Sequence, residues 1–97
     1  MAAAIKLYRG GDKTFTIRYT DAAGAALPYT GTPELIFAHP RIASAITLSN
    51  AEAALGRVGV RIAWNDQMPM DEEMGFRVRV MRGGDRKTTP EIVVVVK

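Results

Sequence analysis

Apolar and polar residues alternate over three segments of the chain, and a period of two is that of a β-strand with one buried face. The segments are KTFTIRYT from Lys13 to Thr20, GRVGVRIAW from Gly56 to Trp64, and GFRVRVMR from Gly75 to Arg82. Each predicts a strand, and their apolar positions predict a core between two sheets. The predicted core residues are Phe15, Ile17, Val60, Ile62, Trp64, Phe76, Val78 and Val80.

Four further strands are predicted from shorter patterns, which brings the expected number to about seven. They run over Ala4 to Tyr8, Glu34 to Ala38, Ala45 to Leu48 and Pro90 to Val96. The intervening segments are rich in Gly, Pro, Asn and Asp, and only SNAEAAL has a pattern typical of a short helical turn. Short strands without a long segment of helical period indicate an antiparallel β-sandwich or a small barrel.

The tetrapeptide RGGD occurs twice, at Arg9 to Asp12 and at Arg82 to Asp85. Both copies lie between predicted strands, and paired glycines accept the positive φ angles of a type I′ or II′ hairpin turn. We therefore expect both copies to be turns of this kind that connect strands. The alternative is a ligand motif that is used twice.

Length and composition predict one folded domain over residues 1–97. Of these 97 residues 47% are hydrophobic and 24% are charged, values that disfavour intrinsic disorder. The chain contains no cysteine, which excludes disulfides and thiol chemistry. The N-terminus, MAAAIKLYRGG, lacks the pattern of a signal peptide, and the longest apolar run, Ile92 to Val96, is too short to span a membrane. The formal charge of +3 is too modest to identify a partner.

Three candidates for chemistry give no enzyme, metal or cofactor prediction. His39 is the only histidine, stands beside Pro40, and has no nucleophile motif nearby, so we interpret it as a strand-end residue. The consecutive acids Asp71, Glu72 and Glu73 lack the spacing of a calcium loop and indicate an exposed acidic loop. The stretch GGDKT lacks the spacing and the helix of a phosphate-binding loop.

Five arginines occupy the polar register of predicted strands, and we expect some of them to align on one sheet surface as a basic face. They are Arg18, Arg57, Arg61, Arg77 and Arg79. The alternative is a solvated face on which the arginines pair with Glu34 or Glu91. No aromatic residues alternate with these arginines, so stacking on the bases of a nucleic acid is not predicted.

The closing strand predicts an assembly surface. Ile92, Val94 and Val96 take the inward register, which leaves Val93 and Val95 pointing outward from a terminal strand that can lie at the edge of a sheet. An exposed strand of this composition tends to aggregate unless a partner covers it. We therefore expect Val93 and Val95 to contact another subunit, in a homo-oligomer or a larger complex.

Several local features come together in a family resemblance. They are an opening strand, a turn at Gly11-Asp12, an alternating second strand, a D-x-x-G turn from Asp21 to Gly24, the PYTG stretch from Pro28 to Gly31, and a final hairpin that ends in EIVVVVK. In this order the chain resembles the small Ig-like virion proteins of tailed bacteriophages, including the N-terminal domain of phage baseplate upper proteins. It departs from their pattern in the doubled glycine before Asp12 and in FAHPR after the third strand.

The resemblance implies an all-β, Ig-like antiparallel β-sandwich of about seven strands with at most one short helical turn, and no catalytic residues or cofactor. It also implies a structural role in a virion, in the tail, the baseplate or associated with the head, through contacts with other virion proteins. The chain would be made in the bacterial host cytoplasm. An alternative is a module that binds host-surface glycans, for which Tyr29 is the main exposed aromatic candidate because Trp64 is in core register. No specific nucleic acid or membrane partner is expected.

Overall fold

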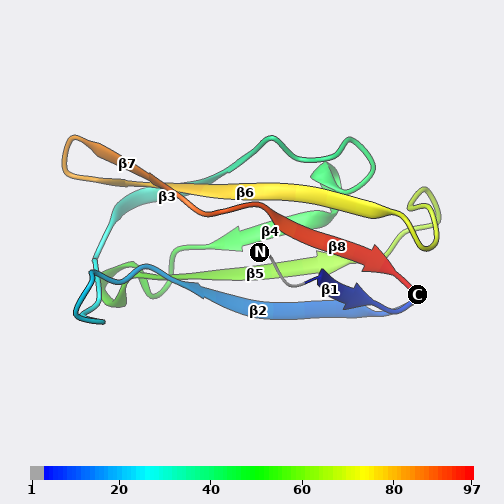
Figure 1. The fold of residues 1–97 in the computed structure, drawn as a ribbon, viewed down its shortest axis with the longest axis horizontal. Coiled ribbons are helices and arrows are strands. Elements are labelled where there is room, and N and C mark those ends of the chain that lie inside the picture. The colour runs from blue at the N-terminus through cyan, green and yellow to red at the C-terminus, as the bar shows by residue number, and fades with distance from the viewer. Residues whose placement is uncertain (1–3) are drawn as a thin grey trace.

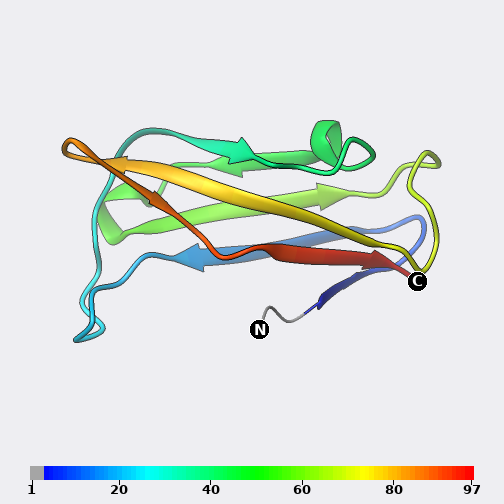
Figure 2. The same ribbon diagram turned by 45° about the horizontal axis from the view of Figure 1, so that its top comes forward.

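Within residues 4–97, which the computed structural model describes, eight strands form two sheets packed face to face (Figures 1 and 2). Residues 1–3, part of the stretch considered above for a signal peptide, lie outside the described residues. The strands are β1 (Ala4–Leu7), β2 (Asp12–Arg18), β3 (Thr30–Ile36), β4 (Ile46–Ser49), β5 (Arg57–Ala63), β6 (Glu73–Arg82), β7 (Asp85–Thr88) and β8 (Ile92–Val96). The prediction of an all-β sandwich is confirmed.

One sheet has five strands and the other has three. In the five-stranded sheet the order is β1-β8-β6-β3, and β7 also pairs with β6. The three-stranded sheet has the order β2-β5-β4, and both of its pairings are antiparallel. The strands run roughly along the long dimension of the molecule, which measures 38 Å (Figure 1).

The core lies between the sheets and follows the predicted register. Val60, Ile62, Phe76, Val78 and Val80 are buried, whereas Phe15, Ile17 and Trp64 are half-buried and pack against them. Pattern reasoning did not find Ile42 and Met68, which are also buried, because both come from irregular segments where alternation gives no signal. The burial of these apolar side chains is the main source of favourable folding free energy.

The position of β8 differs from the expectation of an edge strand. β8 lies between β6, with which it pairs antiparallel, and β1, which pairs with it in parallel from Ala4↔Val93 to Leu7↔Val96. The edge prediction for the closing strand is therefore wrong. A local pattern cannot show this parallel pairing, because its two strands come from opposite ends of the chain.

Two small elements, the strand β7 and the 3-10 turn η1, were not predicted from the sequence. β7 contains Asp85, Arg86, Lys87 and Thr88, all of them exposed, so it has no apolar alternation and exists as a strand through its pairing with β6. The helical turn expected in SNAEAAL is the 3-10 turn η2 (Ala53–Leu55), and a second 3-10 turn, η1 (Ala43–Ala45), precedes β4.

The two RGGD copies form different connections. Gly83 and Gly84 join the paired residues Arg82 and Asp85, and φ is +61° at Gly83 and is not positive at Gly84, as in a type II′ hairpin turn. Gly10 and Gly11 instead connect β1 in one sheet to β2 in the other. Both copies are turns that connect strands, as predicted, but only the second closes a hairpin, so the hairpin geometry is wrong for the first.

Candidate interaction surface

The side chains with acid-base chemistry do not converge on one site. The ring Nδ1 of His39, just beyond β3, accepts a hydrogen bond from the backbone N–H of Arg41 at 3.1 Å, and its Nε2 lies 3.9 Å from a carboxylate oxygen of Glu72. Among residues 4–97, no three His, Asp or Glu side chains are grouped so that they could hold a metal ion. The described part of the chain also contains no helix that is long and apolar enough to cross a membrane.

The five candidate arginines occupy two faces of the sandwich. Arg18, Arg57 and Arg61 lie on the outward face of the three-stranded sheet, where Arg18 of β2 stands directly opposite Arg57 of β5. Arg77 and Arg79 lie on β6, on the outward face of the five-stranded sheet. The structure therefore brings three of the predicted residues together and separates the other two from them.

Carboxylates neutralise most of these arginines. Arg57 pairs with Glu52 at 3.1 Å, Arg79 pairs with Glu34 at 2.7 Å, and Arg61 pairs with Asp12. The hydrogen bond and the positive charge of Arg79 hold the pKa of Glu34 below its ordinary value. This arrangement favours the solvated, ion-paired interpretation over a basic binding face, and it confirms the expected pairing with Glu34.

Glu91 does not pair with an arginine but lies across Gly75. A Cβ atom at Gly75 would lie 2.7 Å from Oε2 of Glu91, so this position on β6 has room for the Glu91 side chain only because it carries none of its own. Gly75 is the neighbour of Val93 in the β6–β8 register. The acidic side chain thus borders the outward valines of β8.

Val93 and Val95 point to the outward face of the five-stranded sheet, as predicted, but both are half-buried. Their neighbours across the sheet are Ala4 and Lys6 on β1. On the other side β6 presents Gly75 and Glu73. Because these neighbours are small or charged, the two valines are the main apolar side chains on this part of the face.

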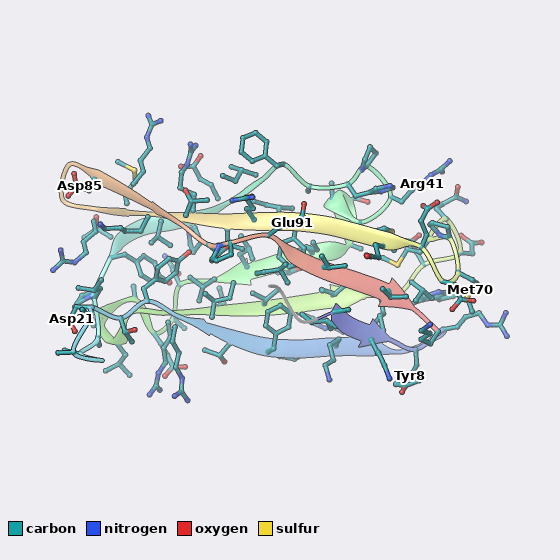
Figure 3. All side chains as sticks on the ribbon, in the orientation of Figure 1. Tyr8, Asp21, Arg41, Met70, Asp85 and Glu91 are labelled. Carbon is teal, nitrogen blue, oxygen red and sulfur yellow. The ribbon has the colours of Figure 1, made fainter. Side chains whose placement is uncertain are left out.

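Two exposed apolar side chains lie beside this surface, at the end of β8. Tyr8 follows Leu7, which pairs with Val96, and 65% of the Tyr8 residue is exposed. Met70 forms a bridge to the other edge of Val96 and is 45% exposed. Figure 3 shows both at the same end of the molecule. We refer to Tyr8, Met70, Val93 and Val95 as the apolar strip.

Sequence reasoning missed half of this strip. Tyr8 continues the outward register of Ala4 and Lys6, so the alternation of β1 could have found it. Met70 lies in the loop between β5 and β6, where no periodic signal exists. Its position depends on the bridge to Val96, a contact between distant parts of the chain.

Among residues 4–97 the most exposed large apolar residue is Phe37, which directly follows β3. The residue is 82% exposed and its backbone φ is +51°, a conformation that bulky residues rarely adopt. Phe37 is the first residue of the FAHPR stretch.

Tyr29, the aromatic residue considered for glycan contact, is buried instead. Only 4% of it is exposed, and its hydroxyl donates a hydrogen bond to the carbonyl oxygen of Arg57 at 2.7 Å. Its ring packs edge-to-face on Tyr19 with the ring centroids 6.3 Å apart. The expectation that Tyr29 is exposed is therefore wrong, because the segment before β3 folds over the end of the core.

No family model matches this chain, and the comparisons with curated proteins and with solved structures also found no match.

Proposed function

We propose that this chain is a non-enzymatic structural protein that assembles with other subunits through the apolar strip. The observation that carries the proposal is the pair of large exposed side chains, Tyr8 and Met70, which flank the end of β8 beside Val93 and Val95. Large apolar side chains in contact with water favour association, because their burial removes apolar area from solvent.

We further propose that the assembly is a phage or prophage virion. The family resemblance supports this, and two structural observations agree with it. The pairings β8-β6-β3 and β2-β5-β4 correspond to strands G-F-C and B-E-D of an Ig-type sandwich, which supports the Ig-like assignment. Asp21 also closes the turn implied by the resemblance, since its carboxylate accepts hydrogen bonds from the N–H groups of Ala23 and Ala25, each at 2.9 Å.

The size of the strip sets the expected strength of the contact. A fully exposed apolar side chain contributes about 1.5–3 kcal/mol when it becomes fully buried. Tyr8 and Met70 are exposed in the single chain, whereas Val93 and Val95 are half-buried and have already gained part of this burial free energy within the fold. Ordering two subunits opposes these gains. The strip alone thus supports weak self-association or one contact among several in a particle.

The assembly proposal is tested with the double variant Val93→Lys/Val95→Lys. We expect sedimentation velocity at high protein concentration to show weaker association, while the thermal melt remains cooperative because both side chains point outward. The matched control is Thr47→Lys/Ser49→Lys, which adds two lysines to exposed positions of β4 in the other sheet. Unchanged association of the valine variant would contradict a role for β8 in the strip.

The virion proposal has its own test. Particles are purified from a culture that carries this gene, and their proteins are identified and quantified by mass spectrometry. We expect the chain to be present at a fixed ratio to the major particle proteins and to remain after high-salt washing. Its absence from washed particles would contradict the virion role.

A second candidate function is glycan binding on the host surface, and the exposed rings of Tyr8 and Phe37 favour it. Aromatic rings exposed at the ends of strands can stack on sugar faces. Wild type and the single variants Tyr8→Ala and Phe37→Ala are compared on a glycan array. Binding that is lost in either variant supports this function, and no binding by the wild type removes it.

A further inference from the structure

One edge of the sandwich differs from the others. β1, β4 and β7 are edge segments of four residues each, and β7 consists of polar and charged residues. β3 contains Pro33, and its pairing with β6 shifts register between Thr30 and Glu34. Short length, charge, proline and irregular pairing are all devices that prevent an edge from pairing with another chain.

β2 is longer than the four-residue edge segments, contains no proline and no register shift, and its charged residues Asp12, Lys13 and Arg18 lie toward its two ends. It pairs with β5 without a break over seven residues, from Asp12↔Ala63 to Arg18↔Arg57. Within residues 4–97 no strand pairs with its other edge, which follows the lower border of the ribbon in Figure 1. β2 is therefore a long, regular strand with one unpaired side, and it can accept a strand from another molecule.

The side chains of β2 are complementary to those of a second, antiparallel β2. When the pairing is centred on Phe15, Asp12 faces Arg18 of the second copy and Thr14 faces Thr16. All four positions lie on the outward face of the sheet, where directly opposite side chains interact. A parallel pairing in register would place Asp12 against Asp12 and Arg18 against Arg18, which is unfavourable.

The monomer leaves these groups available for such a contact. Arg18 has no ion pair or side-chain hydrogen bond with any of residues 4–97, and Arg57 opposite it is already paired with Glu52. Asp12 contacts Arg61, but 46% of its side chain is exposed and a carboxylate can accept several hydrogen bonds. An antiparallel second copy thus supplies a carboxylate to Arg18.

The inward face of β2 also gains from a second copy. Phe15 and Ile17 are only half-buried, because they lie at the border of the core. In the antiparallel pairing the two Phe15 residues are adjacent at the centre. Lys13 stands opposite Ile17 of the second copy near the end of the ladder, where its stem can cover apolar surface while its ammonium group reaches water.

We propose that β2 is a two-fold interface at which two copies of this chain pair edge to edge, joining their three-stranded sheets into one continuous antiparallel sheet. The contact is isologous, so it closes on itself and contains the Asp12–Arg18 pair twice. It lies on the three-stranded sheet and leaves the apolar strip, on the other sheet, free for different subunits. This inference goes beyond the proposed function and does not depend on the virion role.

The test uses the charge reversals Asp12→Arg and Arg18→Asp, analysed by sedimentation equilibrium at low salt. Each variant alone places like charges opposite each other twice, and we expect its dimer dissociation constant to rise at least tenfold. When the two variants are mixed, both positions again pair an arginine with an aspartate, and we expect the dimer to return with one copy of each. Asp12→Arg also removes the ion pair with Arg61. This loss is the same in the variant alone and in the mixture, so it cannot explain a recovery of the dimer in the mixture.

A second measurement identifies the direction of pairing. The chain has no cysteine, so Thr14→Cys and Thr16→Cys can be introduced without other thiols. The two single variants are oxidised mildly, each alone and mixed with the other. Antiparallel pairing places position 14 of one chain directly opposite position 16 of the other, within disulfide reach. It therefore predicts a disulfide between chains in the mixture and little in either variant alone. Parallel pairing predicts the reverse.

Three results would overturn the proposal. They are a wild type that stays monomeric at millimolar concentration, a mixture of the charge variants that stays as dissociated as its components, and cross-links that form within each single cysteine variant. Val93→Lys/Val95→Lys is expected to keep the β2 dimer. This separates failure of the β2 contact from failure of the apolar strip.

Discussion

The two RGGD segments have identical letters and different roles. The first, which we call the crossing turn, connects β1 of the five-stranded sheet to β2 of the three-stranded sheet. The second, which we call the hairpin turn, joins neighbouring strands β6 and β7 of one sheet. The two turns lie at opposite ends of the molecule (Figures 1 and 2).

Both segments use their first glycine in the same way. φ is +85° at Gly10 and +61° at Gly83, values that glycine adopts without steric cost. In the crossing turn the N–H of Gly11 donates to the carbonyl oxygen of Tyr8 at 2.9 Å, as in a type II turn with glycine at its third position. The difference lies in what the adjoining strands bury. Leu7 before the crossing turn is in the core, whereas β7 after the hairpin turn is exposed along its length.

The largest losses of stability are expected when a charge is introduced into the core that the strands beside both turns share. Leu7 is 1% exposed on β1, and Val78 on β6 is fully buried. Leu7→Asp and Val78→Asp should each cost several kcal/mol by burying an unpaired charge, enough to unfold a domain of ordinary stability. The measurement is cooperative thermal unfolding by circular dichroism. Thr16→Asp, on the exposed face of β2, is the control, and a wild-type melt for Val78→Asp would disprove the predicted register.

The next largest loss of stability is expected from valine at the first glycine of each turn, and it compares the two turns directly. Valine at a left-handed position costs about 1–2 kcal/mol, so Gly10→Val and Gly83→Val should both destabilise the protein. We expect Gly10→Val to cause the larger loss of unfolding free energy in urea. The exposed hairpin can open locally to relieve its strain, whereas the crossing turn cannot relax without displacing Leu7. The reverse order would show that the hairpin turn controls global stability.

A third, smaller loss of stability is expected at the end of β2 away from the crossing turn, where the side chain of Tyr19 connects the two sheets through a hydrogen bond. Its hydroxyl donates to the carbonyl oxygen of Val78 at 2.9 Å, and burial together with Tyr29 raises the pKa of Tyr19 to about 12. Tyr19→Phe should cost about 1 kcal/mol at neutral pH through loss of this hydrogen bond.

The pH dependence of this variant follows from the raised pKa. The folded state favours the neutral phenol, so its contribution is complete below the ordinary value of 10 and is lost as the pH rises toward 12. We therefore expect the stability difference between wild type and Tyr19→Phe to shrink over this range. Denaturant unfolding at several alkaline pH values measures it, and a constant difference would contradict the raised pKa.

The smallest effect concerns the second glycine of each turn, since neither Gly11 nor Gly84 has a positive φ. A Cβ at Gly84 would meet nothing within 4 Å, whereas one at Gly11 would lie 3.3 Å from the carbonyl oxygen of Tyr8. Gly84→Ala should stabilise the protein by about 0.4–1 kcal/mol through the unfolded-state entropy. Gly11→Ala should gain less or nothing, and equal gains in urea unfolding would contradict the crowding at the crossing turn.

The candidate interaction surface was predictable only in part. The outward register of Val93 and Val95 follows from alternation, because each residue of a strand faces away from its neighbours in sequence. The exposure of Met70 and the burial of Tyr29 do not follow from the sequence, because both residues lie in loops whose positions depend on contacts with distant strands. The division of the five arginines between two faces likewise depends on which sheet each strand joins.

The sequence by itself determined the all-β class, the inward residues of the regular strands, and the need for a turn at each glycine pair. These properties are local: a period of two places alternate side chains on opposite faces, and adjacent glycines tolerate turn angles. The tertiary structure decided that β1 shields β8, that β7 is a strand, and that one RGGD crosses between sheets while the other closes a hairpin. The physical reason is that strand partners are chosen by hydrogen bonds and shared apolar burial between segments far apart in the chain, and no short stretch of sequence contains both members of such a pair.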